Sequence, residues 1–215
     1  MLRSGPRLDR LKIVPPKPQI KRGKKFMVGY LGVIGQQEGI EYLLDAARHI
    51  RDEIGRDDIF WGIVGGGPHL AQLRRRCSEM GLDDIVEFTG RVSDEMLLDY
   101  LNTADVCVNS DEYNEMNDKS TMNKILEYMA LGKPIVQFDL TEGRYSAGEA
   151  SLYARPNDAT DLARKVVELL DDPARRERMS QTGRDRIINH LSWEHTSKAL
   201  LEAYDRYFTE REASR

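Results

Sequence analysis

Several features that define known classes of protein are missing from this chain of 215 residues. No apolar run approaches the ~18 residues that a membrane-spanning helix requires, and the first residues lack the apolar core of a signal peptide. The two cysteines, Cys77 and Cys107, are too few for a disulfide framework. We therefore expect a protein of the reducing cytoplasm.

Repeats and low-complexity tracts are missing as well. The four histidines all fall in segments with helical periodicity, so we assign no general base among them. With 40% hydrophobic and 32% charged residues, the composition is that of an ordinary globular protein.

The charge of the chain is unevenly distributed. Nine lysines and arginines but only one acid fall within residues 1–25, although the whole chain carries a formal net charge of −4. A basic arm of this kind can hold nucleic acid or an anionic membrane surface. However, Pro15, Pro16 and Pro18 stiffen it and no aromatic residue interleaves the charges. We therefore interpret residues 1–25 as a linker, expect no nucleic-acid partner, and place one domain at 26–215.

From residue 26 onward, short apolar runs alternate with segments of helical periodicity. We expect strands at 26–32, 59–64, 85–89, 105–109, 134–139 and 151–154. We expect helices at 39–54, 68–80, 94–102, 121–131, 158–170, 173–190 and 192–210. This alternation predicts an α/β fold, with a Rossmann-like, doubly wound sheet of about six parallel strands in a single domain.

Ligands of such sheets bind beyond the carboxyl ends of the strands, and glycines follow three of these ends. Gly32 and Gly35 lie between the first strand and its helix, where backbone amides can approach a phosphate. Gly66 and Gly67 belong to a run of three glycines, which is more than a plain turn requires. Arg91 follows the third strand, where its side chain either stacks on a base or faces water. The alternative for each turn is an ordinary strand-to-helix connection.

The fourth strand leads into an acidic segment and then a helix. Ser120 or Thr121 is placed to cap this helix. Asn123, Lys124 and Glu127 are three or four residues apart, which predicts that they share one helix face. A lysine and a glutamate near a helix N-terminus suit a phosphate and a sugar hydroxyl, respectively. The ordinary alternative is an exposed ion pair between the two, which stabilises a protein little.

The stretch that begins at Glu127, Glu-Tyr-Met-Ala-Leu-Gly-Lys-Pro-Ile-Val, resembles the Glu-Ala-Met-Ala-x-Gly-x-Pro-Val-Val segment of glycosyltransferase family 4. The segments 29–39, 65–68, 88–92, 101–108 and 169–193 are similar to the same family in the same order. The resemblance covers about residues 26–210.

Members of this family are retaining, nucleotide-sugar-dependent enzymes of the GT-B fold, in which two Rossmann-like domains face each other across a cleft. The chain resembles the C-terminal domain, which holds the donor, with the interdomain linker in front of it. The resemblance implies a missing N-terminal domain that binds the acceptor and contributes a histidine near the reacting centre. We therefore expect this chain alone to be inactive, and at most to bind donor.

The acidic donor ligands of the family carry over in part. Glu127 matches the second glutamate of the family's Glu-x7-Glu motif, which holds the ribose hydroxyls. The first glutamate is replaced by Lys119. By position, the neighbouring Asp118 or Glu115 can approach the donor sugar instead.

Two cationic donor ligands of the family are missing. The arginine and lysine that clamp the diphosphate in the family's first loop are replaced by Val33 and Glu38. Each lost contact to a charged group weakens phosphate binding by roughly 1.5–3 kcal/mol. Lys124 is the first candidate to replace them, and Lys119 is the second.

The resemblance implies a parent enzyme that transfers a sugar from a nucleoside-diphosphate sugar, as in polysaccharide biosynthesis, in the cytoplasm or at the inner membrane surface. No Asp-x-Asp triplet occurs, so we expect no metal and no other cofactor. Losing both clamp cations also fits an alternative, a degenerate, non-catalytic binding or interaction domain of the same fold. A dinucleotide-dependent oxidoreductase is disfavoured, because the first loop lacks the Gly-x-Gly-x-x-Gly spacing.

The last expected helix carries an apolar stripe formed by Leu200, Leu201, Tyr204 and Phe208. In the family, this helix crosses back to the N-terminal domain. Without that domain, we expect part of the stripe to be exposed or to be buried by self-association.

Overall fold

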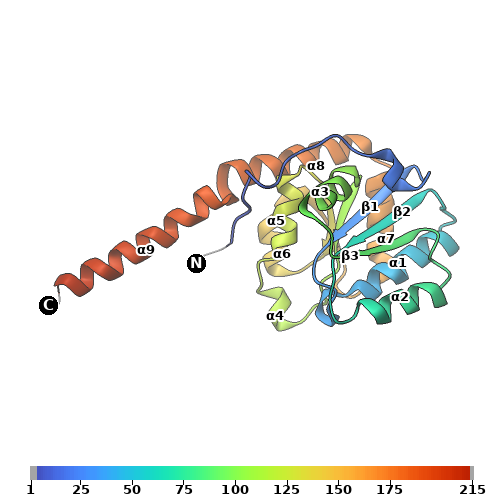
Figure 1. The fold of residues 1–215 in the computed structure, drawn as a ribbon, viewed down its shortest axis with the longest axis horizontal. Coiled ribbons are helices and arrows are strands. Elements are labelled where there is room, and N and C mark those ends of the chain that lie inside the picture. Colours follow the sequence, from blue (N-terminus) through green and yellow to red (C-terminus); the bar gives the residue numbers. More distant parts are fainter. Residues whose placement is uncertain (1–3, 214–215) are drawn as a thin grey trace.

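Six parallel strands form the centre of the computed structural model, which describes residues 4–213 (Figure 1). They are β1 (Phe26–Leu31), β2 (Ile59–Val64), β3 (Val86–Gly90), β4 (Val106–Asn109), β5 (Ile135–Phe138) and β6 (Ser151–Ala154). Their order in the sheet is β3-β2-β1-β4-β5-β6, and every neighbouring pair is parallel. The predicted doubly wound α/β architecture is therefore confirmed, with all six strands within one residue of the expected bounds.

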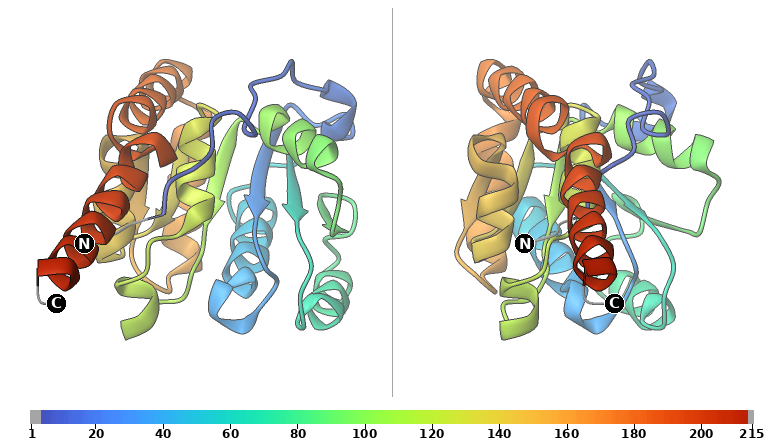
Figure 2. Two further views of the ribbon diagram at one scale, coloured as in Figure 1. Left: turned by 60° about the vertical axis from the view of Figure 1, so that its left-hand side comes forward. Right: turned by 90° about the vertical axis from the view of Figure 1, so that its left-hand side faces the viewer.

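Helices cover both faces of this sheet (Figure 2). One face is covered by α1 (Ile40–Asp52), α2 (Leu70–Glu79) and α7 (Ala159–Leu170), and the other by α3 (Asp94–Thr103), α5 (Asn123–Ala130) and α6 (Thr141–Ala147). Alternate side chains of β1 serve the two cores, because successive residues of a strand point to opposite faces. Val28 and Tyr30 pack with α1, whereas Met27 packs with α3 and α5.

Two short helices were not predicted from the sequence, α4 (Glu115–Asp118) and α6. Neither is long enough to show a clear periodicity, and the two are joined by polar contacts. The Asp118 carboxylate accepts hydrogen bonds from the backbone N–H (2.7 Å) and the hydroxyl (3.0 Å) of Thr141, the first residue of α6. These helices are therefore products of tertiary contact.

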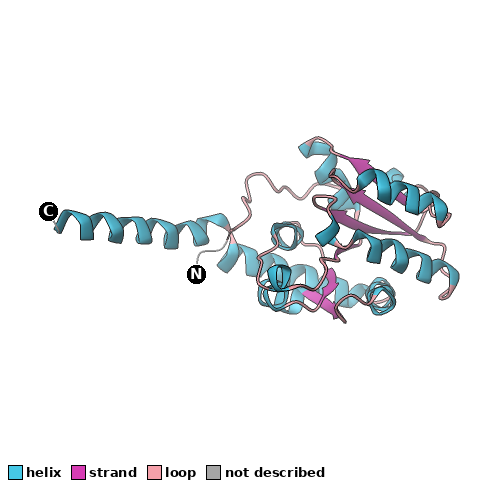
Figure 3. Cartoon of the chain, turned by 90° about the horizontal axis from the view of Figure 1, so that it is seen from below, coloured by secondary structure: helices cyan, strands magenta, loops and turns pink. Residues whose placement is uncertain are grey.

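The last helices leave the sheet. α8 (Pro173–Arg186) contacts both α5 and α7, so it bridges the two faces, and it ends in a π-helical turn, η4 (Ile187–Leu191). α9 (Trp193–Ala213) then projects away from the domain (Figures 1 and 3). The expected apolar stripe on α9 is largely exposed, at 61% for Leu201, 55% for Tyr204 and 57% for Phe208. None of the described helices is long and apolar enough to cross a membrane.

The described part of the basic arm packs against α3. Lys17 pairs with Asp99 (2.6 Å), and Lys21 in the 3-10 turn η1 (Pro18–Lys21) pairs with Asp105 (2.7 Å). Leu8, Leu11 and Ile20 pack on the core beneath it. Much of the positive charge of the arm is therefore neutralised by the domain itself.

Candidate functional site

The site is built where the sheet changes its winding direction. The chain turns to one face after β1 and to the other face after the neighbouring β4, and α/β sheets bind ligands at such a switch point. Tyr128 of α5 ties the two strands together there. Its hydroxyl accepts a hydrogen bond from the N–H of Leu31 (2.8 Å) and donates to the carbonyl of Val108 (3.2 Å).

The glycine-rich loops after β1 and β2 lie backbone to backbone. Ile34 N–H donates to the Gly66 carbonyl at 3.0 Å. A Cβ on Gly65 would lie 1.8 Å from the Gly32 carbonyl oxygen, and a Cβ on Gly67 would lie 2.4 Å from that of Ile34. The run of three glycines thus has a structural reason in this close approach, in addition to any role toward a phosphate.

The other loop residues singled out by the sequence lie around this contact. Arg91 follows β3 with its side chain exposed, and its Cγ lies 3.1 Å from the position of a Cβ on Gly66. Gly35 begins the 3-10 turn η2 (Gln36–Glu38), which carries Glu38 toward β4. The structure therefore brings Arg91, Gly35 and the two glycine loops to one edge of the sheet.

Lys124 occupies the switch point together with two carboxylates. Its ammonium lies 2.5 Å from Glu38 Oε2 and 2.7 Å from Asp111 Oδ1. The three side chains are 9%, 15% and 1% exposed, respectively. Tyr30 completes the cluster, because its hydroxyl lies 3.2 Å from Glu38 Oε2, to which it donates. We call Lys124, Glu38 and Asp111 the switch-point triad.

The triad carries one positive and two negative formal charges when both acids are ionised. Burial raises the pKa of Asp111 to about 6, although the Lys124 ammonium opposes this rise. Burial alone would also raise the pKa of Glu38, but the charge and hydrogen bond of Lys124 hold it below its usual value. Asp111 Oδ2 is buried and has no hydrogen-bond partner among the described residues. Asp111 is therefore the acid of the triad that takes up a proton first.

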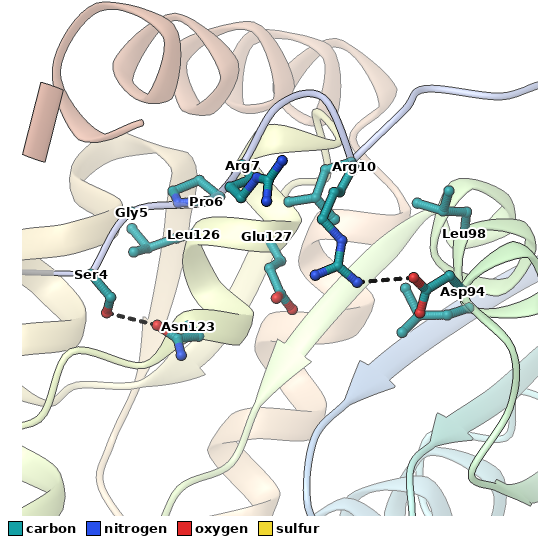
Figure 4. Close-up of a pocket in the computed structure, with 12 residues that line it drawn as sticks. Ser4, Gly5, Pro6, Arg7, Arg10, Asp94, Leu98, Asn123, Leu126 and Glu127 are labelled. Atoms are coloured by element: carbon teal, nitrogen blue, oxygen red, sulfur yellow. Dashed lines mark hydrogen bonds and ion pairs between the residues drawn. The ribbon is translucent and has the colours of Figure 1, made fainter. Parts of the chain in front are cut away.

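Glu127 faces a separate cavity, which we call the arm cavity (Figure 4). This cavity of about 270 Å³ lies between the basic arm, α3 and α5. Ser4 donates a hydrogen bond to Asn123 at 2.8 Å along one side, and Arg10 pairs with Asp94 at 2.9 Å on the other. Burial raises the pKa of the Glu127 carboxyl, and the positive charges of Arg10 and Lys124 offset part of this rise.

The predicted common face of α5 is divided in the structure. Asn123 and Glu127 line the arm cavity, whereas Lys124 turns to the switch point. The alternative of an exposed pair between Lys124 and Glu127 is wrong, since the lysine is buried and held by other acids. The reason is electrostatic, because Glu38 and Asp111 approach the ammonium from two loops that only the fold brings together.

The predicted cap of α5 is also wrong. α5 begins after Met122 and no side chain caps it. Ser120 instead donates to the Met116 carbonyl (2.6 Å) of α4, and Thr121 donates to Glu142 (2.9 Å) of α6. These hydroxyls are used by the two short helices that the sequence analysis missed.

The remaining acidic candidates lie on α4. Glu115 forms an exposed pair with Lys119 at 2.6 Å, so neither contacts the triad. Asp118 holds the N-terminus of α6, as described above. None of these three side chains lines the arm cavity.

Sequence reasoning missed Asp111 and His69 as individual site residues. Asp111 lies two residues after the buried strand β4, which was the available signal, but its segment was considered only as an acidic loop. His69 precedes α2, and its backbone N–H donates to the Ile34 carbonyl at the crossing of the glycine loops (3.0 Å). Its Nδ1 is buried without a hydrogen-bond partner among the described residues. Its position after three glycines and a proline was the signal for its place at this edge.

Comparison with known proteins identifies the family. The family described as "Glycosyl transferases group 1" matches residues 25–172. The 2-deoxystreptamine glucosyltransferase of Streptomyces kanamyceticus is 27% identical over 182 residues, which make up 84% of this chain and 45% of that protein. The chain spans about half the length of the curated relatives it matches.

Solved structures agree in fold. HepE of Anabaena, in complex with UDP-glucose, superposes with a TM-score of 0.83 at 16% identity, over 95% of this chain and 57% of that one. The C-terminal domain of a group 1 family glycosyl transferase, LpcC of Francisella tularensis, gives a TM-score of 0.73 at 17% identity, over 88% of this chain and 100% of that one. The chain therefore belongs to the group 1 glycosyltransferases and has the fold of a C-terminal GT-B domain.

Proposed function

We propose that this chain is the donor-binding domain of a retaining glycosyltransferase, and that residues 1–25 link it to an acceptor-binding domain outside this sequence. The observation that carries the proposal is the Glu127 carboxylate, which faces the arm cavity beside a switch point. A half-buried carboxylate that faces a cavity suits the hydroxyls of a ribose. HepE of Anabaena, which shares this fold, has been solved in complex with UDP-glucose.

The donor would lie along the sheet edge from the arm cavity to the switch point. Glu127 and Asn123 would bind the nucleoside. The amides of the loops at Gly32, Gly35, Gly66 and Gly67, together with Arg91 and Lys124, would face the diphosphate. Ser120, Thr121 and Asp118 follow toward the sugar.

The catalytic contribution of this domain would be electrostatic. Negative charge develops on the diphosphate as the sugar departs, and fixed backbone dipoles and cations lower the energy of that charge without reorganising. No step requires a metal ion. The nucleophile and any general base would come from the acceptor side, so turnover requires the parent enzyme, which would act in polysaccharide biosynthesis in the cytoplasm or at the inner membrane surface.

A degenerate binding domain is the second candidate, and the triad favours it. Lys124 already has two acidic partners, so the switch point has no excess positive charge for a diphosphate. A domain that has lost its donor would tolerate such a cluster.

Titration calorimetry of the chain against UDP, GDP and ADP separates the two. Donor binding predicts heat with one nucleotide and an affinity at least tenfold weaker in Glu127→Ala, because the buried hydroxyl partner is lost. The matched control is Glu79→Ala, which changes an exposed glutamate at the C-terminal end of α2. This variant should bind the nucleotide as wild type does. Absence of heat with all three nucleotides, in a sample with a cooperative unfolding transition, would support the degenerate domain.

A further inference from the structure

The switch-point triad holds one more acid than a structural ion pair needs. Asp111 lies 2.7 Å from the Lys124 ammonium and is 1% exposed, so it alone can neutralise this lysine inside the fold. Glu38 is a second partner at 2.5 Å, supplied by a different loop. A buried cation with two carboxylates leaves an excess negative charge, which is costly away from water.

Glu38 also lies on the accessible side of the triad. It is the most exposed of the three groups, at 15%, and its turn η2 extends beyond the end of β1. Beside it, Gly32 lets the loop after β1 pack closely on the triad, because a Cβ there would lie 2.6 Å from the Tyr30 hydroxyl and 3.2 Å from Lys124 Cε. A phosphate that reaches for Lys124 from the switch point therefore meets the Glu38 carboxylate.

We propose that Glu38 is a specificity-determining residue, whose carboxylate competes with a ligand's phosphate for the Lys124 ammonium and so disfavours a free nucleoside diphosphate more than its sugar ester. The inference rests on the proposed function. The expected selectivity follows from the different charges of the two ligands. A terminal phosphate with a second pKa near 6 carries almost one more negative charge at pH 8 than the same phosphate esterified to a sugar. Repulsion by a carboxylate at this range grows with each ligand charge.

The consequence of this selectivity concerns inhibition by the product. The sugar ester is the substrate and the free diphosphate is the product of the proposed transfer. A carboxylate that repels the product more strongly than the substrate limits product inhibition, at the cost of weaker binding of both. Weaker product inhibition would thus explain why the protein keeps the excess negative charge that Glu38 brings to the triad.

The test is titration calorimetry at pH 8 with UDP, GDP and ADP and with their glucose esters, on wild type, Glu38→Gln and the control Glu79→Gln. Glutamine keeps the shape and an acceptor for the Tyr30 hydroxyl, while Asp111 still holds Lys124 in place. We expect Glu38→Gln to bind the free diphosphate at least tenfold more tightly, and to tighten its glucose ester by a factor at least threefold smaller. The control should match wild type with both ligands.

Three outcomes overturn the inference. Equal tightening of both ligands in Glu38→Gln removes the selectivity. Unchanged or weaker binding, with wild type still binding, means that Glu38 only positions Lys124, and it leaves the proposed function intact. No binding of any ligand to either protein overturns both proposals. Glu38→Ala, which removes the charge and the side chain together, guards against a misfolded glutamine variant and should show the same selectivity change.

Discussion

The switch-point triad makes Lys124 the most informative position for a stability experiment. Lys124→Met keeps an unbranched side chain of similar length but removes the ammonium that lies between Glu38 and Asp111. Two carboxylates are then left facing each other without a cation, and one of them is almost fully buried. Breaking a buried ion pair in this way costs about 3–5 kcal/mol. We expect the free energy of unfolding to fall by that amount at pH 8.

The loss should depend on pH in a defined direction. The pKa of Asp111 is raised from 3.8 to about 6, so the folded state holds this proton more tightly than the unfolded chain does. A raised carboxyl pKa contributes stability that is present at low pH and lost as the pH rises through about 6. Between pH 5 and pH 8 this contribution is worth about 1 kcal/mol for wild type. Without Lys124 the proton is held more tightly still, so the cost of Lys124→Met should be smaller at pH 5.

Urea unfolding followed by circular dichroism measures these free energies, with Lys124→Met/Glu38→Gln as the second arm of a double-mutant cycle. Removing one acid should restore at least half of the stability lost in Lys124→Met. The reasoning would be refuted by a loss below about 1 kcal/mol at pH 8, or by a double variant no more stable than the single one. Either result would mean that the triad is solvated and contributes little.

Three further predictions concern other parts of the molecule. Gly65→Ala should lower the free energy of unfolding by more than ~3 kcal/mol, because φ is +139° and the new Cβ would lie 1.8 Å from a carbonyl oxygen, whereas Gly55→Ala, at φ +78° with no atom within 4 Å, should cost only ~1–2 kcal/mol in the same urea titration. Burial raises the pKa of Cys77 to about 11 and of Cys107 to about 12, so both thiols should resist a thiol reagent at pH 8 in buffer and react rapidly in urea, and fast labelling of the native protein would contradict their burial. The exposed stripe of α9 predicts self-association of the isolated chain, and sedimentation showing a monomer that binds no hydrophobic dye would count against it.

The sequence predicted the fold well because its signals are local. Short apolar runs with helical segments between them specify parallel strands and crossover helices, and all six strands were found within one residue. The prediction failed where an element is short. α4 and α6 are stabilised by contact with each other through Asp118 and Thr141, which no periodicity records. Ser120 and Thr121 do not cap α5, because their hydroxyls donate to Met116 of α4 and Glu142 of α6.

The candidate site could be predicted only in part from the residue types. Strand-end glycines and the polar face of a helix pointed to Lys124 and Glu127, and both lie at the sheet edge. Their common face was wrong, because Lys124 turns toward Glu38 and Asp111 while Glu127 turns toward the arm cavity. Spacing along a helix gives the direction in which a side chain leaves its Cα. The long side chain of Lys124, however, bends toward the carboxylates that surround its ammonium.

The sequence by itself therefore determined the class of fold and the family, since these depend on periodicity and on motifs of adjacent residues, and it predicted the edge of the sheet at which we propose that a ligand binds. Only the tertiary structure decided the charge of the site. Glu38, Asp111 and Lys124 come from three separate segments, and the fold places both carboxylates within 2.7 Å of the Lys124 ammonium. Electrostatic interactions depend on distance and burial, and neither quantity is written in the order of residues along the chain.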